Sequence, residues 1–152
     1  MYMNNTEAIT ETARDFLETE PFFVSALSNI SALIMESITD INWAGFYLMR
    51  SGKLTLGPFQ GKPACIHIGI GKGVCGTCAV KDKTIVVPDV HQFPGHIACD
   101  AGSRSEIVIP IHKDGKIVAL LDVDSPVESR FTRAEQNTLE ELAGVIEEYV
   151  EW

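Results

Sequence analysis

Thiols and carboxylates gather in one stretch of the chain, between residues 65 and 124. This stretch holds all four cysteines, Cys65, Cys75, Cys78 and Cys99. It also holds three carboxylates inside otherwise apolar segments, Glu106, Asp122 and Asp124. A thiolate is a nucleophile, and a carboxylic acid with a raised pKa can donate a proton. The combination therefore predicts nucleophilic or redox chemistry that needs a proton source.

The composition excludes several classes of partner. The chain has 152 residues, which suits one domain with one core. Its net charge of −9 repels the phosphate backbone of nucleic acids and anionic membranes. No apolar run reaches the roughly 18 residues of a membrane span, and the N-terminus has no apolar signal core. We therefore expect a cytoplasmic protein, in which thiols are more often catalytic, metal-bound or simply buried than joined in structural disulfides.

The spacing of apolar residues predicts the order of the elements. Helical spacing covers residues 6–20 and 22–38, and a capping box formed by Thr132 and Glu135 opens a third helix. Strands are predicted over residues 42–49, 54–56, 84–87, 105–111 and 116–124, with a long loop over 57–76 that holds a short strand near 65–68, and a short helix over 73–80. This order predicts an α+β fold. Its antiparallel sheet carries the N-terminal helix pair and the C-terminal helix on one face, and loops cover a ligand pocket on the other.

The loop between the last two strands decides where the carboxylates point. A two-residue Asp-Gly loop would place Glu106 on the face opposite to Asp122 and Asp124. A three-residue loop pairs Glu106 with Asp122 and makes one uniformly apolar face, so this register is predicted. All three carboxylates then share the other face. Such a cluster is costly unless it binds something, and crowding keeps at least one acid protonated near neutral pH.

The cysteines allow several interpretations. Cys75 and Cys78 form a C-x-x-C pair, but its glycine-rich surroundings lack the context of a thioredoxin-like redox motif. A zinc site of Cys75, Cys78, Cys99 and one of three histidines lacks the second close ligand pair of structural zinc. Cys99 lies in residues 88–104, a polar segment without periodicity, and long segments of this kind are often functional. An accessible thiol, a second thiol and a protonated acid together suit reduction of an S–O bond.

Several phrases of the sequence are long enough to be specific: NWAGFYL, GPFQGKPACIHIGIGKGVCGT, VVPDVHQFPGHIACD, SEIVIPI and LLDVDSP. In this order and spacing they resemble the free methionine-(R)-sulfoxide reductases, which are GAF-domain enzymes. The resemblance covers nearly the whole chain and implies a single GAF domain over residues 1–152. The alternative is a GAF module that senses a small ligand or a redox state without catalysis.

The resemblance implies a role for eight residues. The implied catalytic residues are Cys99 as nucleophile, Cys65 as resolving cysteine, and the acids Glu106, Asp122 and Asp124, which also bind the substrate. The implied lining of the substrate pocket includes Trp43, Tyr47 and Cys75. Cys78 is an additional thiol, so Cys75 and Cys78 stay open as alternative resolving cysteines.

The resemblance also implies a reaction and its partners. Cys99 would become a sulfenic acid, then a disulfide that thioredoxin reduces, with no bound cofactor or metal. Residues 88–104 are the candidate lid of the pocket. The N-terminal helices are candidates for a homodimer interface.

Overall fold

The computed structural model describes residues 6–96 and 102–152, which form one antiparallel sheet and four α-helices. The sheet has six strands in the order β3-β2-β1-β6-β5-β4. In chain order the elements are α1 (Thr6–Thr19), α2 (Phe23–Ser37), β1 (Trp43–Arg50), β2 (Lys53–Gly61), β3 (His67–Ile68), α3 (Gly73–Lys81), β4 (Ile85–Val87), the 3-10 turn η1 (Val90–Gln92), β5 (Ser105–Lys113), β6 (Lys116–Ser125) and α4 (Arg133–Tyr149). The predicted α+β class is confirmed.

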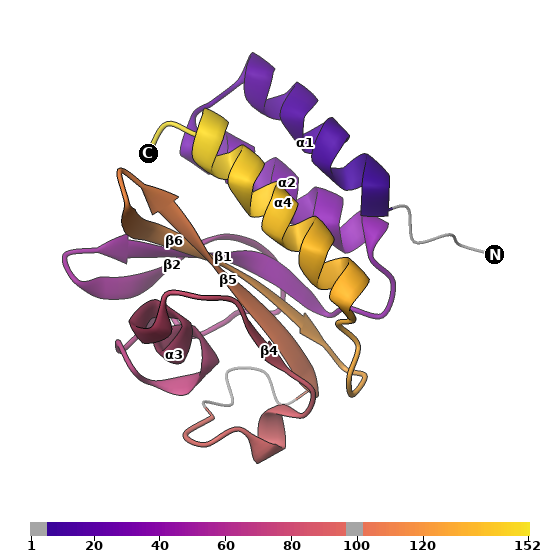
Figure 1. The fold of residues 1–152 in the computed structure, drawn as a ribbon, viewed down its shortest axis with the longest axis vertical. Helices are drawn as coiled ribbons and strands as arrows, with labels where there is room; N and C mark the ends of the chain where they lie inside the picture. Colours follow the sequence, from indigo (N-terminus) through magenta and orange to yellow (C-terminus); the bar gives the residue numbers. More distant parts are fainter. Residues whose placement is uncertain (1–5, 97–101) are drawn as a thin grey trace.

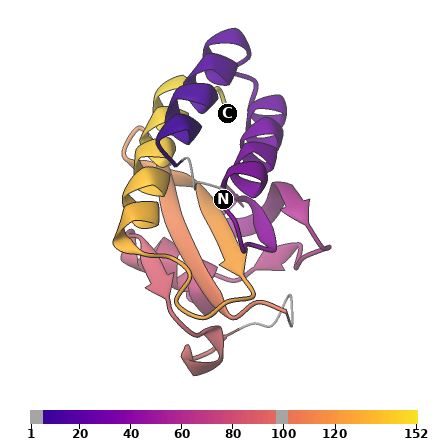
Figure 2. The same ribbon diagram turned by 90° about the vertical axis from the view of Figure 1, so that its right-hand side faces the viewer.

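Three helices cover one face of the sheet. α1, α2 and α4 pack together on that side, as the two ribbon views show (Figures 1 and 2). Alternate residues of the central strands, such as Phe46, Ile109 and Leu121, meet the apolar stripes of the helices in the larger of two hydrophobic clusters. The N-terminal helix pair and the C-terminal helix therefore lie where the apolar periodicity predicts them.

The opposite face of the sheet carries α3 and the connecting segments around it (Figure 1). The remaining alternate residues, among them Tyr47, Val108 and Leu120, form a second hydrophobic cluster with Val74 and Cys78 of α3. α3 is thus the predicted short helix, and it places one helical layer over the face that was expected to carry only loops.

The pairing of β5 with β6 differs from the predicted register. Asp114 and Gly115 form a two-residue turn in which both residues have positive φ (53° and 76°), so Lys113 pairs with Lys116. A bulge at Val118 then adds one residue to β6, and beyond it Glu106 pairs with Asp124 rather than with Asp122. The predicted register is wrong because it assigned the extra residue to the turn. The predicted face is right, because the extra residue in β6 turns Asp122 and Asp124 to the same face as Glu106.

The structure also extends β2 beyond its predicted range, through Pro58 to Gly61. Proline removes a ladder hydrogen bond and is tolerated where a strand has no neighbour. The adjacent strand β3 pairs only with Leu54 and Thr55, so Pro58 lies on an open edge of β2. The predicted loop over residues 57–76 therefore begins later than expected, after Gly61.

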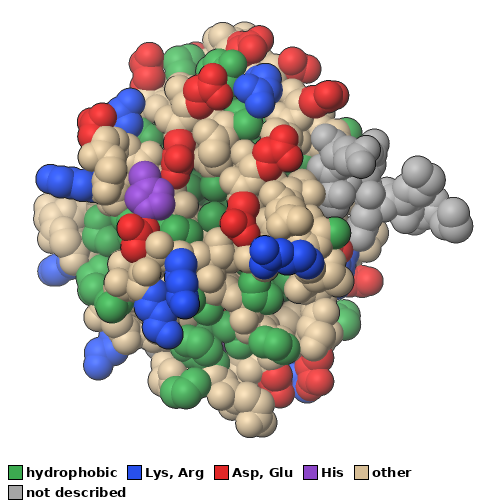
Figure 3. All heavy atoms as spheres, viewed as in Figure 1, with side chains coloured by type: hydrophobic (Ala, Val, Ile, Leu, Met, Phe, Trp, Pro, Cys, Tyr) green, Lys and Arg blue, Asp and Glu red, His purple; other side chains and the backbone are tan. Residues whose placement is uncertain are grey.

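The chain is acidic overall, with 21 acidic and 12 basic residues. On the face seen in Figure 3, acidic side chains gather over the helical layer in the upper half, while hydrophobic side chains lie mainly below it. None of the helices in the described part of the chain is long and apolar enough to cross a membrane.

His112 joins three elements through its imidazole ring. Its Nε2 lies 2.6 Å from Oδ1 of Asp82 at the end of α3, and its Nδ1 lies 3.0 Å from Oε1 of Glu147 on α4. Partial burial alone would lower the pKa of His112, but the hydrogen bonds to Asp82 and Glu147 and their charges outweigh it and raise the pKa. Carboxylates only accept hydrogen bonds, so both ring nitrogens donate when the ring is charged.

We predict that His112→Gln destabilises the protein more under mildly acidic conditions than under alkaline ones. A raised folded-state pKa gives stability that is fully present below the unfolded value of about 6.5 and is lost as pH rises through the folded value. The loss should be about 1 kcal/mol or less, because the groups are partly exposed. Urea unfolding of both proteins on each side of the transition checks this. An equal difference at both pH values would contradict it.

Candidate functional site

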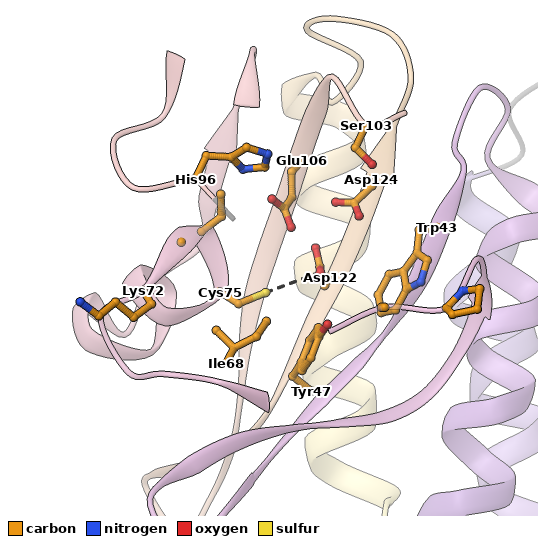
Figure 4. A pocket seen from close by; sticks show the side chains of 14 residues that line it. Trp43, Tyr47, Ile68, Lys72, Cys75, His96, Ser103, Glu106, Asp122 and Asp124 are labelled. Carbon is orange, nitrogen blue, oxygen red and sulfur yellow. Dashed lines mark hydrogen bonds between the residues drawn. The ribbon is translucent and has the colours of Figure 1, made fainter. Parts of the chain in front are cut away.

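Three strands bring the carboxylates together on the face that α3 covers. Antiparallel pairing places Trp43 of β1 opposite Asp124 of β6, and Asp124 opposite Glu106 of β5. Asp122 lies two residues from Asp124 on the same face and opposite Gly45. Figure 4 shows the three carboxylate groups turned toward one another. The sheet alone therefore creates the acidic cluster.

These carboxylates line a cavity of about 50 Å³ between the sheet, α3 and the segment that precedes it. Six of the predicted site residues line it together: Trp43, Tyr47, Cys75, Glu106, Asp122 and Asp124. The others that line it are Pro63, Ala64, Ile68, Lys72, Gly73, Val74, His96 and Ser103. Because the residues come from five separate segments, the cavity exists only in the folded chain.

An aromatic wall closes one side of the cavity. The ring of Trp43 stacks on Tyr47 at 6.1 Å between centroids and on Phe59 at 5.2 Å. The indole Nε1 donates a hydrogen bond to the Lys62 carbonyl at 3.1 Å, which fixes the ring. Gly45 leaves the space that this stack needs, because a Cβ there would lie 2.3 Å from the Cβ of Phe59 and 2.9 Å from Trp43.

The α3 helix delivers Cys75 to the carboxylates. Gly76 allows the helix to lie against the preceding loop, since a Cβ there would meet the Gly69 carbonyl oxygen at 2.5 Å. The thiol of Cys75 then donates to Oδ2 of Asp122 at 3.5 Å, the dashed line in Figure 4. Oδ1 of Asp122 is buried and has no donor among the described groups unless a neighbouring carboxyl group is protonated.

Burial and crowding favour a proton on Glu106. Burial raises the pKa of Glu106 well above its usual range, and the charges of Asp122 and Asp124 and hydrogen bonds to them raise it further. Burial also raises the pKa of Asp122, but side-chain hydrogen bonds with Glu106, Cys75 and Asp124 oppose that rise. The proton in this cluster therefore belongs on Glu106, with Asp122 as the acceptor.

The two buried thiols are poor nucleophiles. Burial raises the pKa of Cys75 well above its usual value, and the charge of Asp122 adds to this. Burial likewise raises the pKa of Cys78 to about 12, and its sulfur faces the carbonyl oxygens of Lys83 at 3.3 Å and Val108 at 3.8 Å. Both are free thiols. Since the thiolate is the reactive form, neither suits direct attack at neutral pH.

Cys65 differs from these two thiols because it is disulfide-bonded. Its carbonyl oxygen accepts a hydrogen bond from the hydroxyl of Tyr47 at 2.9 Å, so the aromatic wall holds the backbone of this cysteine. Burial, followed by the charge of Asp122, raises the pKa of Tyr47 and keeps it a donor. Cys99 lies outside the described residues, so its role stays a prediction.

The zinc set considered from the sequence is not assembled by the described residues, because the sulfur of Cys78 faces backbone carbonyls. The group there that could hold a metal ion is instead Cys75, Glu106 and Asp122. In this group the carboxylates of Glu106 and Asp122 replace the other cysteines and the histidine of the set considered from the sequence.

Sequence reasoning missed Ser103 and the first turn of α3 as parts of the site. Ser103 is buried and accepts a hydrogen bond from Nδ2 of Asn42 at 3.2 Å. The N–H groups of Gly73, Val74 and Cys75 precede the first bond of the helix, which Gly76 donates to the Lys72 carbonyl at 2.9 Å. The glycines around Cys75 were the available signal for this turn.

Comparisons with known proteins identify the family of the chain. The GAF domain family matches residues 6–150. Free methionine-R-sulfoxide reductase of Escherichia coli is 48% identical over 148 residues, which are 95% of this chain and 90% of that protein. The reduced form of fRMsr of Staphylococcus aureus superimposes with a TM-score of 0.93 at 50% identity, covering 97% of this chain and 96% of that one. Free methionine-R-sulfoxide reductase of Neisseria meningitidis, solved in complex with its substrate, gives 0.91 at 38%, covering 95% and 87%.

We predict that Gly45→Ala destabilises the fold by about 1–3 kcal/mol, because the new methyl group overlaps Phe59 and displaces Trp43. Urea unfolding measures the loss, and near-ultraviolet circular dichroism reports the disturbed aromatic stack.

Gly144→Ala is the matched control. A Cβ at Gly144 on α4 meets nothing within 4 Å, so this change should stabilise the protein by up to about 1 kcal/mol. Equal stability of Gly45→Ala and the unchanged protein would refute the close approach at Gly45.

Proposed function

We propose that this chain, which belongs to the free methionine-R-sulfoxide reductases of the GAF-domain family, reduces free methionine (R)-sulfoxide to methionine. The observation that carries the proposal is the cavity, in which an indole and a phenol face three converging carboxylates. A wall of this kind suits an apolar thioether chain, and the carboxylates suit a cationic amino group.

The ends of the cavity complement a zwitterion. A carboxylate of the cluster would pair with the substrate ammonium group, and Oδ1 of Asp122 lacks an ordinary donor there. The N–H groups at the start of α3, which precede the first hydrogen bond of the helix, belong to residues that line the same cavity and would donate hydrogen bonds to the substrate carboxylate. A methionine sulfoxide inside a peptide has neither charge, which would explain a preference for the free amino acid.

The chemical step transfers an oxygen atom between two sulfur atoms. The Cys99 thiolate would attack the sulfoxide sulfur while an acid protonates the sulfoxide oxygen. The S–O bond of the substrate breaks, methionine leaves, and Cys99 carries the oxygen as a sulfenic acid. The proton donor that we assign is Glu106, because it is the acid that burial and its neighbours hold protonated.

Cys65 would resolve the sulfenic acid. Its thiol would condense with it to a disulfide and release water, and thioredoxin would reduce the disulfide by thiol exchange. Two observations support Cys65: it is the described cysteine that is disulfide-bonded, and Tyr47 ties its backbone to the cavity wall. This cycle needs no bound cofactor and fits the reducing cytoplasm. A homodimer stays a prediction, which sedimentation would test.

The first prediction for the proposed reaction concerns the cysteines. With thioredoxin, its reductase and NADPH, the protein should consume NADPH with free methionine (R)-sulfoxide and not with the (S)-epimer. Cys99→Ser should abolish turnover. Cys65→Ser should release about one equivalent of methionine and then stall, since the nucleophile remains without its resolving thiol.

Cys78→Ala is the control, since its sulfur faces away from the cavity, and it should keep turning over. Full turnover by Cys99→Ser would end the assignment of the nucleophile. No turnover with either epimer would favour the sensor module.

The second prediction concerns the acid. Glu106→Gln should lower the rate of methionine release about 10²–10⁴-fold, because the amide keeps the shape and cannot donate an acidic proton. Single-turnover kinetics with the reduced protein measure this step alone. A loss below threefold would move the role to Asp122 or Asp124, whose Asn variants are the comparison.

A further inference from the structure

We propose that the fully reduced protein binds one Zn²⁺ ion in the cavity through the sulfur of Cys75 and one carboxylate oxygen each of Glu106 and Asp122, with water completing the coordination. The proposal does not depend on the sulfoxide chemistry above.

The first support is geometric. One ligand atom from each of Cys75, Glu106 and Asp122 lies within 4.8 Å of the other two. Zinc bonds of about 2.3 Å to sulfur and about 2.0 Å to oxygen, at the tetrahedral angle, separate the two ligands by about 3.5 Å. The sulfur of Cys75 lies 3.5 Å from Oδ2 of Asp122. This pair therefore already has the separation that a tetrahedral ion requires.

The second support is that the three ligand residues are buried without a cationic side chain to pair with them. Cys75, Glu106 and Asp122 are only 4%, 8% and 5% exposed, and the described residues bring no cationic side chain to within ion-pairing distance of them. Oδ1 of Asp122 is buried without an ordinary donor, so the cluster still has capacity for a ligand. An ion bound to Oδ2 would cancel the repulsion between the carboxylates, and a water on that ion would donate to Oδ1.

The donor set selects the metal. A thiolate with two carboxylate oxygens suits Zn²⁺ and related borderline ions, whereas Mg²⁺ and Ca²⁺ prefer oxygen ligands alone and more of them. The ion would replace the thiol proton that Cys75 donates to Asp122, and the proton held on Glu106. Both protons pass to solvent, so the charges balance without an oxidant or a reductant.

Binding would have a functional consequence. The ion would occupy the part of the cavity where the carboxylates converge, and it would use the same carboxylate oxygens that a cationic group of another ligand would need. Zinc would therefore compete with any small molecule that uses the same acids. The site needs Cys75 as a free thiol, and Cys75 is a free thiol in this structure.

Titration of the reduced full-length protein with Co²⁺, a spectroscopic substitute for Zn²⁺, tests the proposal. One equivalent should bind with a sulfur-to-cobalt charge-transfer band, and added Zn²⁺ should remove that band. Cys75→Ser should lose the band and weaken Zn²⁺ binding by at least about 100-fold, more than the loss of an outer-shell partner costs. Asp122→Asn should weaken binding as well while keeping the thiolate band.

Cys78→Ser is the matched control, because it removes a thiol from the same helix whose sulfur faces Lys83 and Val108. It should keep the band and the stoichiometry. A Cys75→Ser protein that binds Co²⁺ with the same band as the unchanged protein would overturn the proposal, as would the absence of any bound equivalent in the unchanged protein. Circular dichroism of each variant confirms folding, and the result for Asp122→Asn decides the matter if Cys75→Ser is unfolded.

Discussion

Three carboxylates on one face of a sheet, of which Glu106 and Asp122 are buried, are the constraint on which the rest of the structure depends. Carboxylates cost several kcal/mol when they leave water without a partner, so their neighbours must offset that cost. Here the proton on Glu106 and the thiol of Cys75 supply hydrogen bonds, and the helical layer on the other face supplies the apolar burial. The cluster is tolerated because a large core holds the strands in place.

The same charges decide which thiols can react. The carboxylates and burial suppress the thiolate of Cys75, which makes it a hydrogen-bond donor and a latent metal ligand rather than a nucleophile. In the proposed reaction the attacking thiol would therefore lie outside this buried set, and the acid and the nucleophile would be different groups. Cys65 is held next to the cavity wall through its hydrogen bond with Tyr47.

The secondary structure followed from local patterns, while the exact pairing did not. The apolar spacing of the terminal helices and the capping box of α4, where Thr132 N donates to Glu135 at 3.0 Å, lie where the sequence predicted them. The predicted register of β5 and β6 was wrong by two residues, since a bulge at Val118 leaves no signal within the apolar run of residues 117–121. The predicted β2 was too short because a proline such as Pro58 usually ends a strand. The sequence does not show that the neighbouring strand β3 is too short to pair with this part of β2.

The sequence by itself determined the family, the fold class and the residue types of the site, because these depend on motifs, periodicity and composition. Only the tertiary structure decided that Cys75 hydrogen-bonds Asp122, that the sulfur of Cys78 faces the Lys83 carbonyl, and that burial raises the pKa of Glu106. Distances between segments far apart in the chain decide these points, and so does the burial that the whole fold creates. A local stretch of the sequence determines neither these distances nor this burial.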